Sequence, residues 1–283
     1  MNSATTLPPL EDEIGDVLEK ALRRSGIGED ELARRANVPM GKIRDAIDYR
    51  PAFTLEELRR MAGVLRLNEV GLCALGCGQY PLPEIPLLPF SVWPLAMAHG
   101  IGVVNAYVVS EPGSDRGVLF DTGAGIAALA AAWPAEVRDL RAVFLTHVET
   151  EHAGALCAVM ARFGAAVAFV PQGSSAPCGR PIPEGEILSY GGLEISVFNT
   201  PGHSAAHNCY LVRAKQDRIG PCLLISGDLI FAGSAGGGYS CPRQLQTHLR
   251  RVMDEVPAST VIAPGHGPLT TVEHELRFNP FLD

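Results

Sequence analysis

The stretch Thr146-His147-Val148-Glu149-Thr150-Glu151-His152-Ala153-Gly154 directly follows the apolar run Ala142–Leu145. The run predicts a buried strand, and the residues after it predict a loop at the end of that strand. The loop carries four side chains with lone pairs, at positions 147, 149, 151 and 152, so that several can point to one side. A metal ion needs several such donors within about 2–2.5 Å of one point. The stretch therefore predicts a metal site at a strand end.

Three more donors stand in similar surroundings further along the chain. His203 lies in Thr200-Pro-Gly-His203, Asp228 in Ser226-Gly-Asp228 and His266 in Pro264-Gly-His266-Gly. Each is flanked by glycine at a predicted strand-to-loop junction. The repeated context favours one shared site that gathers these donors with those of the first loop.

The composition is that of a folded globular protein. The chain has 283 residues, of which 47% are hydrophobic and 19% charged, which allows one large domain or two unequal ones. Disordered, collagen-like and coiled-coil classes do not fit this composition. No apolar run approaches the ~18 residues of a membrane span, so we expect no membrane partner.

Cysteine usage and the start of the chain bear on the compartment. The seven cysteines are scattered without paired spacing, which argues against a disulfide framework. The N-terminal sequence lacks the basic-then-apolar layout of a signal peptide. We therefore expect a cytoplasmic location. The net charge of −8 gives an overall field that does not favour nucleic acid.

The chain divides into two parts of different character. Apolar residues recur at helical spacing within residues 11–75, which predicts four or five short helices, and Thr54 with Glu57 predicts a capping box. A proline-rich stretch follows, and beyond it short apolar runs alternate with helix-like segments in an α/β pattern. We predict a helical domain over residues 1–75, a linker over 76–89 and an α/β domain over 90–283.

The layout from Ile27 through Ile47, continuing to Leu67, resembles the repressor-type (Cro/cI-like) helix-turn-helix family. In that family the second helix of the motif enters the DNA major groove. The resemblance makes Lys42, Arg44 and Arg50 candidate DNA contacts, and it implies a homodimer. However, Asp45 and Asp48 lie on the same predicted face, where their carboxylates would repel DNA phosphates. Residues 1–80 carry 11 basic and 13 acidic side chains, so this part lacks the positive charge that is usual for DNA binding. The alternative is a helical domain used for dimerisation or substrate gating.

The second part, from about residue 88 onward, resembles the metallo-β-lactamase superfamily, whose first motif usually reads H-x-H-x-D-H. Phe120-Asp-Thr-Gly123 and Val104-Asn-Ala-Tyr107 match its early strand motifs, and the segments around His203, Asp228 and His266 match its later ones. Ser226–Gly233 and the C-terminal Pro264–Thr271, Glu275 and Asn279–Leu282 are similar to glyoxalase II-like thioester hydrolases. The resemblance implies a four-layer αββα sandwich with the metals at one edge of two sheets.

The same resemblance implies a ligand set. One metal ion would be held by His147, Glu149 and His203, the second by Glu151, His152 and His266, and Asp228 would bridge them. Glu149 stands where the family usually has histidine, and Glu151 where it has aspartate, so the pattern also resembles the di-iron flavodiiron branch. Carboxylate oxygens are harder ligands than imidazole nitrogens, and they shift the metal preference of the site from zinc toward iron or manganese. We expect two divalent ions, zinc or iron with manganese as a further option; the alternative is a degenerate site without metal.

The implied activity is hydrolysis of a small-molecule thioester or ester by a metal-activated water. Asp228 or Glu151 would be the catalytic carboxylate that orients the water and accepts its proton. The loop Gly233–Ser240 contains no arginine or lysine, which leaves glutathione recognition unsupported. Two alternatives stay open: a DNA-binding regulator whose second part senses a metal or ligand, and a di-iron redox enzyme.

Overall fold

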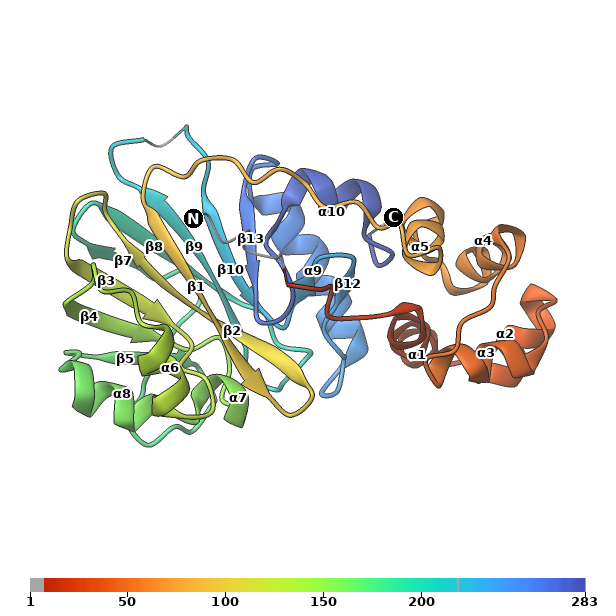
Figure 1. The fold of residues 1–283 in the computed structure, drawn as a ribbon, viewed down its shortest axis with the longest axis horizontal. Coiled ribbons are helices and arrows are strands. Elements are labelled where there is room, and N and C mark those ends of the chain that lie inside the picture. Colours follow the sequence, from red (N-terminus) through yellow and green to blue (C-terminus); the bar gives the residue numbers. More distant parts are fainter. Residues whose placement is uncertain (1–7, 218, 283) are drawn as a thin grey trace, which may run out of the picture.

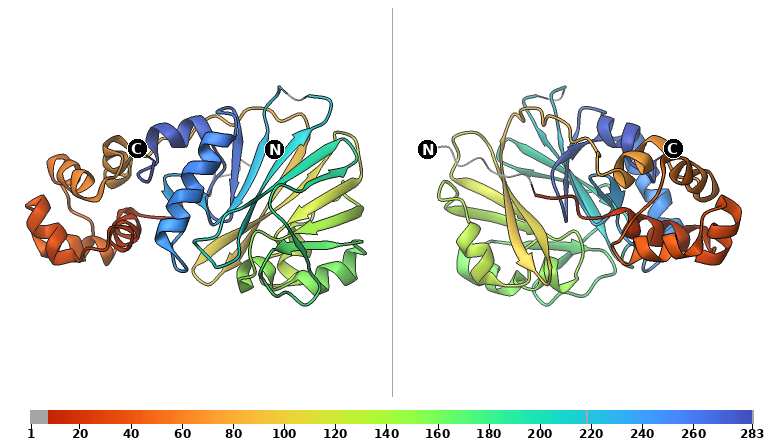
Figure 2. Two further views of the ribbon diagram at one scale, coloured as in Figure 1. Left: turned by 180° about the vertical axis from the view of Figure 1, so that it is seen from behind. Right: turned by 45° about the vertical axis from the view of Figure 1, so that its right-hand side comes forward.

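The computed structural model describes residues 8–217 and 219–282; the predicted domains extend to residues 1–7 and 283, which lie outside these ranges. Two six-stranded sheets lie face to face, with helices on their outer faces (Figure 1). Five short N-terminal helices lie beyond the helices of the second sheet, as Figure 2 shows from two further sides. The α/β domain therefore has the predicted αββα order of layers.

The first sheet has the strand order β1-β2-β3-β4-β5-β6. The first three strands pair antiparallel, and β3 to β6 run parallel. The strand predicted at Ala142–Leu145 corresponds to the fourth strand, which ends one residue earlier, at Phe144. The bounds of the strands are β1 (Ser91–His99), β2 (Gly102–Ser110), β3 (Arg116–Phe120), β4 (Asp139–Phe144), β5 (Ala168–Pro171) and β6 (Arg180–Ile182).

The second sheet has the order β14-β13-β10-β9-β8-β7, in which only β10 and β13 pair parallel. A short hairpin of β11 and β12 follows β10. The bounds are β7 (Ile187–Tyr190), β8 (Leu193–Asn199), β9 (Asn208–Ala214), β10 (Leu223–Gly227), β11 (Ile230–Phe231), β12 (Ser234–Ala235), β13 (Val261–Pro264) and β14 (Thr270–Thr271).

Alternating side chains on the strands build separate cores on the two faces of each sheet. In β4, Phe144 enters the core between the sheets, where it stacks on Phe120 at 5.2 Å between ring centroids, while Val143 faces the outer helices. The outer helices of the first sheet are α6 (Ile126–Ala132) and α8 (Leu156–Phe163), and those of the second are α9 (Pro242–Glu255) and α10 (Val272–Phe278). The single-turn helix α7 (Thr150–Ala153) follows β4.

The N-terminal segment forms the predicted short helices. They are α1 (Ile14–Ser25), α2 (Glu29–Ala36), α3 (Met40–Ile47), α4 (Leu55–Leu65) and α5 (Glu69–Gly76). The capping box predicted at Thr54 is present: its hydroxyl accepts from the backbone N–H of Glu57, whose carboxylate accepts from the N–H of Thr54. The likeness to a helix-turn-helix stays a prediction.

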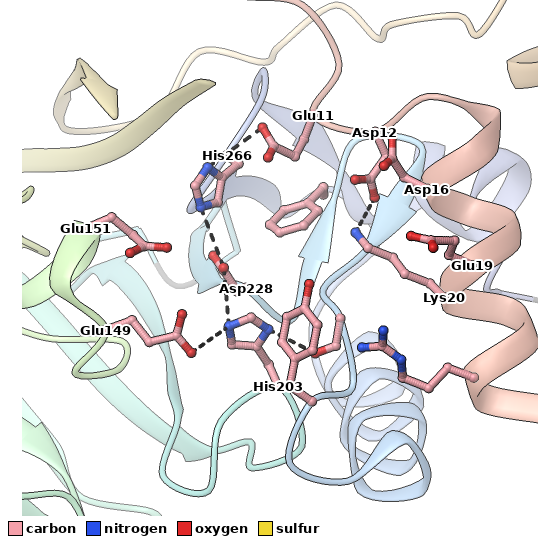
Figure 3. A pocket seen from close by; sticks show the side chains of 14 residues that line it. Glu11, Asp12, Asp16, Glu19, Lys20, Glu149, Glu151, His203, Asp228 and His266 are labelled. Atoms are coloured by element: carbon pink, nitrogen blue, oxygen red, sulfur yellow. Dashed lines mark hydrogen bonds and ion pairs between the residues drawn. The ribbon is translucent and has the colours of Figure 1, made fainter. Parts of the chain in front are cut away.

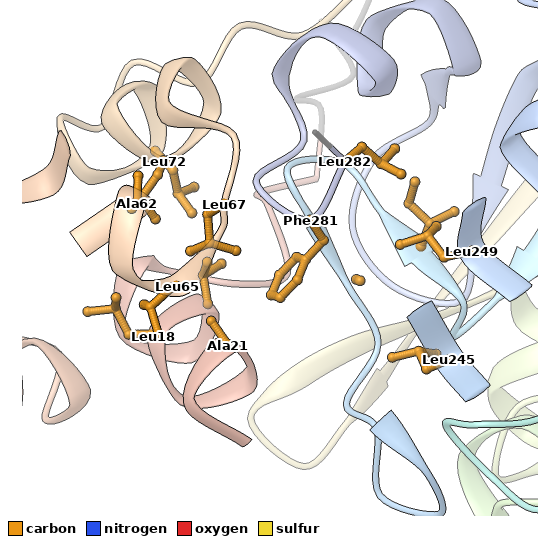
Figure 4. Packing of buried hydrophobic residues seen from close by; sticks show 14 of the residues in the cluster. Leu18, Ala21, Ala62, Leu65, Leu67, Leu72, Leu245, Leu249, Phe281 and Leu282 are labelled. Atoms are coloured by element: carbon orange, nitrogen blue, oxygen red, sulfur yellow. The ribbon is translucent and has the colours of Figure 1, made fainter. Parts of the chain in front are cut away.

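The helical segment shares one hydrophobic cluster with α9 and the C-terminal residues. Figure 4 shows Phe281 between Leu65 of α4 and Leu245 and Leu249 of α9. Asn68 adds polar contacts, since its side-chain amide donates to the carbonyl of Leu282 at 3.1 Å. The two predicted domains are therefore packed together through a common core.

Residues 77–90 contain neither helix nor strand, and the predicted linker over residues 76–89 stays a prediction. The linker is anchored at Tyr80, whose hydroxyl donates to the buried carboxylate of Glu275 at 3.1 Å. Asn279 also donates to that carboxylate at 2.7 Å. The Tyr80 bond attaches the linker to α10, and the Asn279 bond helps to hold the buried carboxylate in place.

One prediction about cysteine is wrong. A disulfide joins Cys157 of α8 to Cys178 in the loop before β6, with 5.8 Å between the Cα atoms. The two residues are 21 positions apart, and only the packing of α8 beside this loop brings them together. Disulfides are typical of oxidising compartments, so the predicted cytoplasmic location stays a prediction. None of the helices within residues 8–217 and 219–282 is long and apolar enough to span a membrane.

Candidate metal centre

The predicted donors come together at one edge of the two sheets because each follows the end of a strand. His147 and the loop through α7 follow β4 of the first sheet. His203, Asp228 and His266 follow β8, β10 and β13 of the second sheet. Both sheets thus deliver ligands to the same place, from segments that are far apart in the sequence.

Asp228 lies at the middle of the cluster. Its Oδ1 is 3.5 Å from Nε2 of His152, and its Oδ2 is 3.5 Å from Nε2 of His203 and 3.6 Å from Nε2 of His266. Glu149 approaches from the other side, with Oε1 at 3.3 Å from Nε2 of His203 (Figure 3). The carboxylate of Asp228 is therefore placed between imidazoles of both predicted metal sites.

The seven predicted ligands sort into the predicted groups. His147, Glu149 and His203 offer ligand atoms within 4.8 Å of one another, and so do Glu151, His152 and His266. A third group joins Asp228 to His147 and His152. The structure therefore brings together all seven side chains; that they bind metal stays a proposal.

Hydrogen bonds at Nδ1 fix which imidazole nitrogen faces the centre. His203 and His266 have Nδ1 at 3.0 and 2.9 Å from the carbonyl oxygens of Gly237 and Val103. A carbonyl oxygen only accepts, so both Nδ1 atoms carry a proton, and the Nε2 atoms are the nitrogens that point to the centre and are left for a metal ion. His152 has Nδ1 at 3.0 Å from the Asp121 carboxylate, with the same result.

Several atoms that face the centre lack a hydrogen-bond partner. Nε2 of His147, His152 and His203 and Oδ1 of Asp228 are buried, and none has a hydrogen-bond partner among the described residues. Buried polar atoms without a partner are costly and rare in folded proteins. A set of such atoms that converge, with imidazole and carboxylate chemistry, fits bound divalent cations.

The electrostatics of the cluster agree with a cation site. Burial by itself would raise the pKa of Asp228, but the surrounding imidazoles hold it well below its usual range, so the carboxylate is ionised. Burial would lower the pKa of His152, but Asp228 and the hydrogen bond to Asp121 raise it to about 9. Without metal this imidazole therefore holds a second proton, which a bound cation would displace. Burial lowers the pKa of His147 well below its ordinary value, which keeps that imidazole neutral and able to bind metal.

Two glycines allow the close approach of these groups. A Cβ at Gly265 would collide with Oδ1 of Asp228 and approach Cε1 of His152 to 2.8 Å. Gly227 has a φ of 48°, and a Cβ there would approach Nε2 of His207 to 2.8 Å. The glycines that flank the donors in the sequence therefore have a steric role.

Some functional positions were not predicted. Asp121 was noted only as part of a motif, yet it binds His152 and accepts from the backbone N–H and hydroxyl of Thr146 at 2.7 and 2.8 Å. His207 accepts from the backbone N–H of Asp228 at 3.2 Å, while its Nδ1 lies 2.7 Å from the hydroxyl of Thr200. These residues hold the ligands in place. Asp121 is identified only by its contacts, whereas the position of His207 just after His203 in the sequence already favours a supporting role.

The helical segment supplies one wall of the site. A cavity of about 300 Å³ opens above the cluster, lined on one side by Glu149 and Glu151 and on the other by residues of α1 and the two residues 11 and 12 before it. Figure 3 shows Asp16, Glu19 and Lys20 of α1 facing His203 and Asp228 across this cavity. No sequence motif indicated this contact.

The three candidate DNA contacts are already paired within the helical segment. Lys42 contacts the carboxylate of Glu57 at 2.8 Å, and Arg44 contacts Glu29 at 2.9 Å. Arg50 contacts Asp45 and Asp48 at 2.9 and 3.2 Å. Each cation is thus largely neutralised, and DNA binding stays an untested prediction.

Comparison with known proteins identifies the family. The family model described as the metallo-beta-lactamase superfamily matches residues 99–266, which is more than half of the chain and contains all seven clustered donors. The chain belongs to the metallo-β-lactamase superfamily. The match begins after the N-terminal helices and the linker, so the α1 wall lies outside the family domain.

Relatives in other organisms match the chain at modest identity. An uncharacterized protein of Aquifex aeolicus is 28% identical over 204 residues, which cover 63% of this chain and 91% of that protein. The hydroxyacylglutathione hydrolase GloC of Haemophilus influenzae is 31% identical over 107 residues. That alignment covers 35% of this chain and less than half, 46%, of GloC.

Two solved structures extend the comparison to three dimensions. TTHA1623, described in a di-iron-bound form, is 28% identical with a TM-score of 0.52, over 67% of this chain and 99% of that one. The B3 metallo-beta-lactamase BLEG-1 is 26% identical with a TM-score of 0.55, over 66% of this chain and 98% of that one. Both therefore share the metallo-β-lactamase domain with this chain.

Proposed function

We propose that this member of the metallo-β-lactamase superfamily is a dinuclear metal-dependent hydrolase that cleaves a thioester- or ester-like carbonyl of a small molecule. The observation that carries the proposal is the convergence of unpartnered Nε2 atoms from His147, His152 and His203 on the ionised Asp228. The naming of one relative as a hydroxyacylglutathione hydrolase supports the thioester class. The di-iron form of a similar structure supports iron, alongside zinc, as the metal.

Bound divalent ions would acidify a water molecule and polarise the substrate carbonyl. His147, Glu149 and His203 would hold one ion, and Glu151, His152 and His266 the other. Asp228 would bridge the two and, being ionised, would accept a hydrogen bond from the attacking water. Glu151, whose side chain is about one quarter exposed at the pocket, is placed to take the proton and release it to solvent.

The remaining side chains of the centre position these groups. Asp121 orients His152 by accepting a hydrogen bond from the Nδ1–H of that imidazole. The carbonyl oxygens of Gly237 and Val103 accept in the same way from Nδ1 of His203 and of His266. The N-terminal helix α1 closes one side of the cavity and limits it to small substrates. A thiolate leaving group would need little protonation, which suits a site without a strong general acid.

The test is metal content followed by hydrolysis. Elemental analysis of the full-length protein should give about two metal equivalents per chain, and thioester and ester substrates should be hydrolysed in a metal-dependent manner. His152→Ala should lose metal and activity together. His248→Ala on α9, outside the cluster, is the matched control and should retain both. Absence of bound metal, or activity unaffected by His152→Ala, would refute the proposal.

A further inference from the structure

Helix α1 brings two cations to the pocket, and only one of them is already used. Lys20 contacts the carboxylate of Asp12, donates to the carbonyl of Ala235 at 2.8 Å and lies 5.2 Å from the ring centroid of Phe231. It thereby ties α1 to the β11–β12 hairpin. Lys20 is a structural cation.

Arg23 is the second cation, and it is available. Its side chain is exposed at the pocket, and within residues 8–217 and 219–282 no carboxylate lies within ion-pair distance of it. Its guanidinium carbon lies 5.0 Å from the ring centroid of Tyr239, which holds it in place by a cation–π contact. A fixed guanidinium without a partner favours an anionic ligand.

Tyr239 connects Arg23 to the metal centre. Its ring meets the ring of His203 edge-on, with centroids 5.4 Å apart, and it is 66% exposed. One aromatic ring therefore separates the guanidinium from a predicted metal ligand, and both face the same cavity. A small substrate can reach both places at once.

Asp12, just before α1, and Asp16 of α1 have structural partners. Glu19 of α1 also lines the pocket but forms no ion pair with Arg23 within the described residues. Asp12 accepts from Lys20 and from the hydroxyl of Ser234. Asp16 accepts from the hydroxyl of Tyr49 and from the backbone N–H of Glu13, both at 2.9 Å. They hold α1 in place, so they leave the guanidinium of Arg23 open to a ligand.

We propose that Arg23, stacked on Tyr239, binds a carboxylate at the end of the substrate remote from the scissile carbonyl. A guanidinium binds a carboxylate through two parallel hydrogen bonds, which also orients the substrate. The N-terminal helix thus supplies the cation that the loop Gly233–Ser240 lacks. The proposal rests on the proposed function, because it places the scissile carbonyl at the metal centre.

The test compares ligands that differ only in charge. S-acetyl-3-mercaptopropionate and its carboxamide are the substrate pair, and 5-oxohexanoate with its carboxamide are ketone analogues that cannot be hydrolysed. The variants are Arg23→Gln and, as a matched control, Arg34→Gln, which removes an exposed arginine of α2 away from the pocket. Arg23→Lys tests whether charge alone is sufficient.

Arg23→Gln should raise KM for the carboxylate substrate about tenfold, with kcat and the carboxamide kinetics nearly unchanged. Arg34→Gln should behave as the wild type, and Arg23→Lys should recover part of the loss. Equal effects of Arg23→Gln on both substrates, or no effect, would overturn the proposal. If the wild type hydrolyses neither substrate, the proposed function fails. The anion site is then tested by ligand-observed NMR with 5-oxohexanoate and its carboxamide. Tighter binding of the carboxylate, lost in Arg23→Gln, supports the anion site. Equal binding of the two ligands by the wild type refutes the anion site.

Discussion

The Nδ1 atom of His152 lies 3.0 Å from Oδ2 of Asp121, and both side chains are buried beneath the metal centre. Asp121 has a φ of 59°, a conformation that is uncommon for residues other than glycine. Its carboxylate also accepts from the backbone N–H and the hydroxyl of Thr146. One carboxylate therefore ties the end of β3 to the loop after β4 and orients a predicted metal ligand.

Asp121→Asn should weaken metal binding about 10- to 100-fold, because the amide removes the negative charge that orients His152 and raises its basicity. Titration of the protein with zinc against a competing chelator measures this. Asp254→Asn, an exposed change on α9, is the control and should leave the affinity unchanged. Equal affinity of Asp121→Asn and wild type would show that the contact plays no part in metal binding.

Glu149→His should move the metal preference toward zinc, because it replaces a hard carboxylate, 3.3 Å from Nε2 of His203, by a borderline imidazole. The metal content of wild type and variant, purified from the same medium with iron, zinc and manganese, gives the answer. Glu136→His introduces the same residue at an exposed position away from the centre. An unchanged iron-to-zinc ratio in Glu149→His would contradict the assignment of Glu149 as a ligand.

Gly71→Ala should loosen the contact between the helical segment and the C-terminal residues. A Cβ at Gly71 would collide with the backbone carbonyl of Phe278, and we expect a loss of about 1–3 kcal/mol in the free energy of unfolding. Gly63→Ala on α4 meets no atom within 4 Å and should stabilise by about 0.5–1 kcal/mol. Urea denaturation of both variants checks the pair, and limited proteolysis within residues 77–90 reports release of the segment. Similar stabilities of the two variants would rule out a tight interface.

Glu275 predicts a dependence of stability on pH. Burial raises the pKa of its carboxyl to about 7, against the lowering effect of its hydrogen bonds to Thr270 and Asn279. The carboxyl therefore holds its proton more tightly in the folded state than in the unfolded state, where its pKa is about 4.5. The stabilisation that this proton gives is complete below about pH 4.5 and is lost as the pH rises through about 7. The loss is roughly 3 kcal/mol. Denaturation at a series of pH values should show this slope, and Glu275→Gln should flatten it; an identical slope in the variant would assign the effect to other groups.

The basic side chains predicted to contact DNA should bind it weakly, because Lys42, Arg44 and Arg50 each have a carboxylate partner. A gel-shift experiment with genomic fragments at low salt should show no specific complex. A sequence-specific shift that is lost in Arg44→Ala but not in Arg34→Ala would favour the regulator alternative. Light scattering on the same samples tests the predicted homodimer.

Local sequence was sufficient to predict most of the fold. The apolar runs mark the strands, because a strand buried on both faces needs continuous apolar residues. Thr54 and Glu57 mark a helix start because capping involves residues only three positions apart. The seven donors were predictable for a similar reason, since each lies in a short loop after an apolar run, and the three later ones, His203, Asp228 and His266, are each next to glycine.

The tertiary structure decided what depends on packing between distant segments. The Cys157–Cys178 disulfide, the support of His152 by Asp121 and the placing of Arg23 over Tyr239 have no local signal. Each joins residues from different elements, and their distance is set by how those elements pack. The amino-acid sequence alone therefore determined the elements and the candidate metal ligands, whereas the packing of α1 against the sheet edge decided which residues line the cavity beside them. Short-range hydrogen bonds and hydrophobic periodicity are encoded within a few residues, but the shape of a pocket arises only when separate elements close around it.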